Sequence, residues 1–90
     1  MRDIEAVIED GSRRMQVKLE VAVKAIAERN WDMVILGIVG VSEEFRRIMS
    51  LCGKLSDEQR MKFIHSCGLE HHAAKARIAA ALKRAFEDKK

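Results

Sequence analysis

The apolar positions along the chain recur every three to four residues, which is the period of an amphipathic α-helix. In the first third of the chain one such stripe comprises Met15, Leu19, Ala22 and Ile26. This stripe predicts a helix from about Asp3 to Arg29. Gly11-Ser12 is a candidate break within it, with Ser12 as the N-cap of the main segment.

The next segment, Asn30-Trp31-Asp32, predicts a turn followed by a second helix. Asn30 suits the N-cap, and Asp32 places a negative charge in the first turn, where it favours the helix dipole. The apolar run MVILGIVGV at 33–41 also fits a buried strand, but this chain offers no second strand for it to pair with. As a helix, the segment continues a heptad-like seam with alternating spacings of four and three. That seam comprises Val34, Ile38, Val41, Phe45, Ile48 and Cys52.

A third helix is predicted from the SDEQ segment at 56–59 to about Asp88. Gly53 is placed to end the second helix, and Ser56 with Gln59 forms a capping box that starts the third. Gly68 is a candidate kink or break. The inward seam of this helix comprises Ile64, Cys67, His71, Ala74, Ile78, Ala81 and Ala85.

These patterns predict one all-α domain over residues 1–90. We expect a small antiparallel three-helix bundle, or four helices if the chain breaks at Gly11 or Gly68. The absence of proline supports high helical propensity. The longest apolar run is far too short to span a bilayer, and the acidic N-terminus does not resemble an export signal. We therefore expect a cytoplasmic protein with reduced cysteines and no membrane partner.

The segment HSCGLEHH at 65–72 gathers three histidines and a cysteine. Cys67 and His71 share the inward seam, and Cys52 ends the facing seam, so these three are candidate metal ligands. The chain nevertheless has no CxxC, HxxxH or ExxH pair, and no carboxylate is evident that would orient a Cys–His nucleophile. We expect His71 to be a polar residue tolerated in the core or a groove, and we expect no enzyme activity and no cofactor.

More apolar surface is present than three helices need, which favours a partner. The partner would be another protein's amphipathic helix, a second copy of this chain, or both. The expected contacts are Met33, Leu36, Val39, Met49, Ile78, Leu82 and Phe86. The net charge of +3 lies entirely in residues 56–90, but the basic residues spread around the last helix, which disfavours nucleic acid as the partner.

The order of AVKAIAERNWDMVI (22–35), EEFRRIMSL (43–51), LSDEQRMKFI (55–64) and LEHHAAKARIAAALKRAF (69–86) resembles the FliT-type flagellar export chaperones. That resemblance implies a small cytosolic helical protein that holds a secretion substrate's helix in an apolar groove. A shorter segment, LSDEQRMKFIHSCGLEHHAAK (55–75), is similar to the central part of the Hha family of nucleoid-associated modulators. Two alternatives therefore remain beside the chaperone or adaptor: an Hha-like regulator, and a metal-binding bundle.

Overall fold

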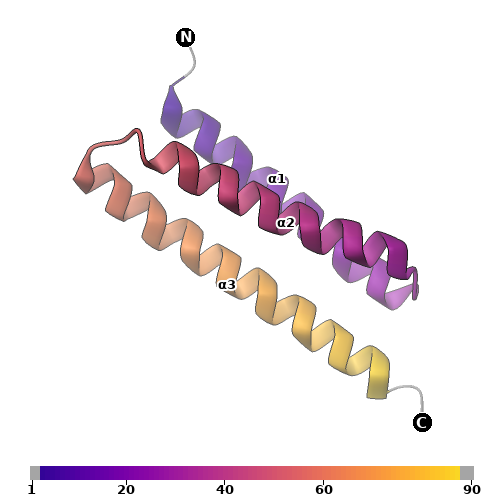
Figure 1. The fold of residues 1–90 in the computed structure, drawn as a ribbon. Coiled ribbons are helices and arrows are strands. Elements are labelled where there is room, and N and C mark those ends of the chain that lie inside the picture. The colour runs from indigo at the N-terminus through magenta and orange to yellow at the C-terminus, as the bar shows by residue number, and fades with distance from the viewer. Residues whose placement is uncertain (1–2, 88–90) are drawn as a thin grey trace.

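The computed structural model describes residues 3–87, which fold into three helices. They are α1 (Ile4–Ala27), α2 (Trp31–Cys52) and α3 (Asp57–Glu87), and the described residues contain no strand. The all-helical, three-helix fold agrees with the predicted fold class. In Figure 1 the chain reverses direction at each of its two short connections, and the three helices lie alongside one another. The predicted last residue of the third helix, Asp88, lies outside the described residues.

The connection between α1 and α2 uses the cap that the sequence predicts. The Asn30 side chain accepts a hydrogen bond from the Met33 backbone N–H at 3.4 Å. Before it, Arg29 adopts φ 57°, and the backbone N–H groups of Arg29 and Asn30 donate to the carbonyls of Ile26 and Ala25. This is the Schellman arrangement, in which the left-handed position is usually glycine. Arg29 therefore holds a conformation that costs a non-glycine residue roughly 1–2 kcal/mol.

The start of α3 is capped largely as predicted. The Gln59 backbone N–H donates to the Ser56 hydroxyl oxygen at 3.4 Å. The returning half of the capping box differs, because the Gln59 side chain bonds to the Ser56 hydroxyl and to the Glu5 carboxylate instead of a backbone N–H. Arg60 then closes the turn by donating to the backbone carbonyls of Cys52, Gly53 and Leu55.

Neither of the two candidate break positions, Gly11 and Gly68, interrupts its helix. Helix α1 continues through Gly11, and a Cβ at this position would lie only 3.0 Å from Ile48 Cγ1 of α2. Gly11 thus allows a close approach of two helices. Ser12 is accordingly not an N-cap, and its hydroxyl bonds to the Glu70 carboxylate of α3. Helix α3 also continues through Gly68, where added atoms would meet open space.

The core follows the predicted seams. The four residues of the α1 stripe are all buried, as are Val34, Val41, Ile48 and Cys52 of α2. In α3 the seam is buried at Cys67, Ala74, Ile78 and Ala85, whereas Ile64 remains 42% exposed. Helix α3 therefore attaches through a few, mostly small, side chains.

Helices α1 and α2 form a closer pair than either makes with α3. Gly37 is the point of nearest approach, since a Cβ there would lie 2.7 Å from Ala22 Cβ and 2.9 Å from its Cα. We call this pair the α1/α2 hairpin. Helix α3 lies along one side of it, and the opposite side has no covering element within the described residues.

The hairpin also contains a buried charge that sequence patterns do not reveal. Glu44 is 1% exposed, and its carboxylate accepts hydrogen bonds from Lys18 Nζ at 2.8 Å, Arg47 at 3.1 Å and Arg14 Nε at 3.2 Å. Burial raises the pKa of the Glu44 carboxyl, but the bonds from Lys18 and Arg14 outweigh it, so that the pKa lies below its usual value. Glu44 thus stays ionised and links the two helices.

Candidate protein-binding surfaces

The exposed apolar side chains are concentrated in the first half of α2. Between Trp31 and Val39 five large hydrophobic residues are exposed, and Ile35 and Leu36 reach 60% and 63%. A helix segment that is apolar on all sides is normally buried on all sides. Here only the side of α2 that faces α1 and α3 is buried, and the rest of the helix surface is exposed.

The first open surface is the α2/α3 groove, on the side of these two helices away from α1. Trp31 of α2 stacks on Phe86 of α3 at one end, with ring centroids 6.3 Å apart and planes within 8°. Further along, Phe45 stacks on His71 with centroids 4.0 Å apart. The residues that line this groove or stack across it are Trp31, Ser42, Phe45, Arg46, Met49, His71 and Phe86.

The rim of this groove is basic. Arg46 lines a shallow depression together with Phe45, Met49 and His71. Burial lowers the pKa of His71, and the charges of Lys75 and His72 lower it further. The imidazole is therefore neutral at pH 7, which suits a ring packed on Phe45 and fulfils the expectation of a polar residue tolerated in a groove.

The second open surface is the hairpin face, on the side of the α1/α2 hairpin opposite α3. It comprises Val17, Val21, Met33, Leu36 and Val39, all of them exposed. Val21 and Met33 line one shallow pocket near the turn between the two helices. The hairpin face and the α2/α3 groove lie on different sides of α2. Each residue is rotated by about 100° from the one before it, so Leu36 and Phe45 point in opposite directions from the helix axis.

The structure separates the residues predicted to contact a partner. Met49 and Phe86 lie at the α2/α3 groove, whereas Met33, Leu36 and Val39 lie on the hairpin face. Leu82 is partly buried and packs against the core. Ile78 is 7% exposed and packs in the core cluster, so its prediction as a surface contact is wrong. The reason is that its neighbours along the α3 seam are alanines, which makes Ile78 the main side chain that seats this helix.

The predicted contacts do not include three exposed, large apolar residues of these surfaces: Val17, Val21 and Trp31. The signal for the two valines is their i, i+4 spacing on a face of α1 that does not carry the core stripe. The sequence pattern places Trp31 in a turn and does not show that it is exposed. An exposed tryptophan is a frequent contact residue in interfaces.

The cysteines lie in the core and not at an open site. Cys52 and Cys67 are both buried free thiols in one apolar cluster with Ile8 and Ile48. Burial raises the pKa of Cys67 to about 11, with a smaller contribution from Glu70, and burial also raises the pKa of Cys52. Thiols that stay protonated at pH 7 are poor nucleophiles and poor metal ligands. No group of three His, Cys, Asp or Glu residues among those described is placed to hold a metal ion.

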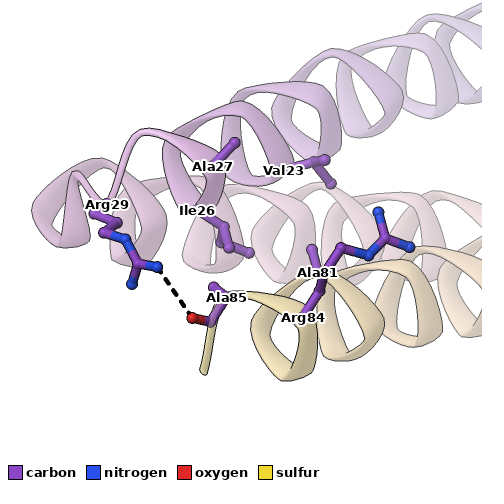
Figure 2. A pocket seen from close by; sticks show the side chains of 7 residues that line it. All are labelled: Val23, Ile26, Ala27, Arg29, Ala81, Arg84 and Ala85. Atoms are coloured by element: carbon purple, nitrogen blue, oxygen red, sulfur yellow. Dashed lines mark hydrogen bonds between the residues drawn. The ribbon is translucent and has the colours of Figure 1, made fainter. Parts of the chain in front are cut away.

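A further pocket lies where α1 and α3 end (Figure 2). Five of its seven lining residues are apolar, and the other two are the arginines Arg29 and Arg84. Arg29 donates a hydrogen bond to the Ala85 carbonyl at 3.1 Å and so satisfies a carbonyl in the last turn of α3. The Arg29 side chain therefore links the α1–α2 connection to the last turn of α3.

Comparisons with known proteins found no matching protein family, no matching curated protein and no matching solved structure. None of the described helices is long and apolar enough to cross a membrane.

Proposed function

We propose that this chain is a protein–protein interaction module that holds the apolar face of a partner's helix in the α2/α3 groove, as a chaperone or adaptor does. The observation that carries this proposal is the exposed Trp31–Phe86 pair at one end of the groove, in line with the open depression at Phe45 and Met49. Paired aromatic residues in an apolar groove are typical of helix-in-groove recognition and of the anchor positions that dominate such interfaces.

The dimensions of the groove define the partner. Trp31 and Phe45 are fourteen residues apart along α2, which corresponds to roughly 21 Å at 1.5 Å per residue. A partner helix of about four turns spans this distance, with apolar side chains repeating every three to four residues. The basic rim formed by Arg46 and Lys75 favours acidic residues along the margins of that helix.

The experiment is affinity capture of a partner with the unaltered chain and with two matched variants. Phe86→Ala removes a groove residue that is 59% exposed, and Leu69→Ala removes an α3 residue that is 57% exposed but lies on another face. The captured protein is then divided into peptides, and binding of the helical one is measured by calorimetry.

We expect Phe86→Ala to weaken binding of that peptide by roughly tenfold or more, because a truncated aromatic anchor typically costs over 1 kcal/mol. Leu69→Ala should leave the affinity unchanged, and neither variant should lower the melting temperature appreciably. Equal affinities for the two variants, or a bound peptide without helical structure in circular dichroism, would contradict the proposal.

A further inference from the structure

The hairpin face carries two stripes of exposed residues with complementary charge. Along α1 the stripe has spacings of three, four and three, and along α2 it has spacings of four, three and four, as in packed helices. The α1 stripe comprises Arg14, Val17, Val21 and Lys24. The α2 stripe comprises Asp32, Leu36, Val39 and Glu43. Each stripe therefore has an apolar centre between two charged ends, basic on α1 and acidic on α2.

Three of these four charges have no ion-pair partner among the described residues. Among residues 3–87, Lys24, Asp32 and Glu43 form no ion pair with one another or with any other residue. Arg14 bonds to Glu44 through Nε alone, and its side chain is 45% exposed. The unpaired charges are therefore complementary to a surface in which an acidic stripe would face α1 and a basic stripe would face α2.

We propose that a second copy of this chain covers the hairpin face, with α1 of each copy packed on α2 of the other. The two-fold axis runs along the bundle, so the register between the copies repeats the register within one copy, where Ala22 lies against Gly37 and Lys18 against Gly40. That register leaves Val21 and Leu36 of the second copy, and likewise Val17 and Val39, within about three residues, or roughly 4.5 Å, of the same height along the bundle. The same register brings Arg14 to Glu43 and Lys24 to Asp32.

The charges also select this orientation over its reverse. A two-fold axis across the bundle would place α1 on α1 and α2 on α2, which would set basic ends against each other and acidic ends against each other. Either axis makes every neighbouring pair of the four central helices antiparallel, which is the usual arrangement of a four-helix bundle, so the charges alone select the orientation along the bundle. Each α3 then lies on the outside, and both α2/α3 grooves stay open, so the dimer is independent of the proposed function.

The first test measures the mass of the full chain by sedimentation from micromolar to millimolar concentrations. We expect a dimer that Leu36→Glu converts to a folded monomer, because a carboxylate would then be buried in the interface. The control, Leu69→Glu, alters an equally exposed leucine on α3 and should remain a dimer. A monomer at every concentration overturns the proposal, and a helical partner that binds the monomer only when Leu36 is intact would identify a different occupant.

The second test exchanges charges. Lys24→Glu sets two acids together at both symmetry-related contacts, which lie at the turn end of the dimer, and Asp32→Lys sets two bases together there. Each variant alone should therefore dimerise roughly tenfold more weakly. An equimolar mixture should recover the affinity, because every mixed dimer pairs the new Glu with the new Lys and leaves the original pair intact. Circular dichroism confirms folding of both variants. Unchanged dimers in the single variants, or no recovery on mixing, overturns the proposed contacts.

Discussion

Two glycines in similar helical positions should respond to alanine in opposite directions. Alanine is favoured over glycine inside a helix by about 1 kcal/mol, so this gain applies to both Gly37→Ala and Gly68→Ala. At Gly68 a Cβ meets no atom within 4 Å, and the whole gain should appear as increased stability. At Gly37 the Cβ would lie 2.7 Å from Ala22 Cβ and within 3.0 Å of its backbone Cα and N atoms.

The cost at Gly37 follows from which atoms are too close. Backbone atoms of α1 cannot rotate away as a flexible side chain can, so α1 and α2 must separate at their point of nearest approach. Overpacking of this kind costs roughly 1–3 kcal/mol, and the separation also loosens the contacts on either side. Because the close atoms belong to the backbone, we expect the upper part of this range, about 2–3 kcal/mol, which is also the expected difference between the two variants. Subtracting the helix gain of about 1 kcal/mol leaves a net loss of about 1–2 kcal/mol for Gly37→Ala.

The assay is thermal and urea unfolding of both variants and the unaltered chain at one fixed protein concentration. In a domain of this size 1 kcal/mol shifts the melting temperature by about 4–8 °C, so Gly68→Ala should melt several degrees higher and Gly37→Ala several degrees lower. If Gly37→Ala is as stable as Gly68→Ala, the close approach of α1 and α2 is not what keeps glycine at position 37.

Three further predictions concern polar residues. Glu44→Gln should lower the free energy of unfolding by roughly 1–3 kcal/mol, because three cations lose a charged acceptor. In urea titrations the variant should also lose less stability than the unaltered chain as pH falls below 4.5, because it lacks the carboxyl whose pKa is lowered by folding. Stability should also fall as pH drops below 6.5, because the pKa of His71 is lower in the folded chain and the unfolded chain binds the proton first. His71→Phe should abolish this loss of stability in melting curves, and an unchanged pH profile in the variant would show that His71 is not its source. Asn30→Ala removes the cap of α2 and should cost about 0.5–2 kcal/mol, whereas Asn30→Asp should retain most of the stability in the same unfolding assay.

The helices and their core stripes could be predicted because each depends on residues close in sequence. Periodicity places Met15 and Leu19 in the core. Asn30 is identified as a cap because its side chain can reach the backbone N–H of Met33, which has no partner within the helix. The effect of a glycine could not be predicted in this way. Gly11 looks like a helix break in isolation, and only the distance to Ile48 on another helix shows why glycine stands there.

The candidate surfaces could be predicted only in part for the same reason. Spacing identifies Leu36 and Phe86 as apolar residues outside the main seams, but it does not say that they belong to different sides of the molecule. That division depends on where α1 and α3 sit around α2. The burial of Glu44 is likewise invisible in the sequence, since its three cationic partners come from two helices and lie up to thirty residues away.

The light anchoring of α3 has a consequence for how the chain opens. Of the thirty-one residues of α3 only four are buried, and two of those are alanines, whereas α1 and α2 are tied by a tight glycine contact and by Glu44. We expect native-state hydrogen exchange to reveal α3 as a separate unit that detaches and returns while the amides of α1 and α2 stay protected. Such partial opening would let the distance between α2 and α3 adjust to partner helices with larger or smaller side chains, while α1 and α2 stay folded.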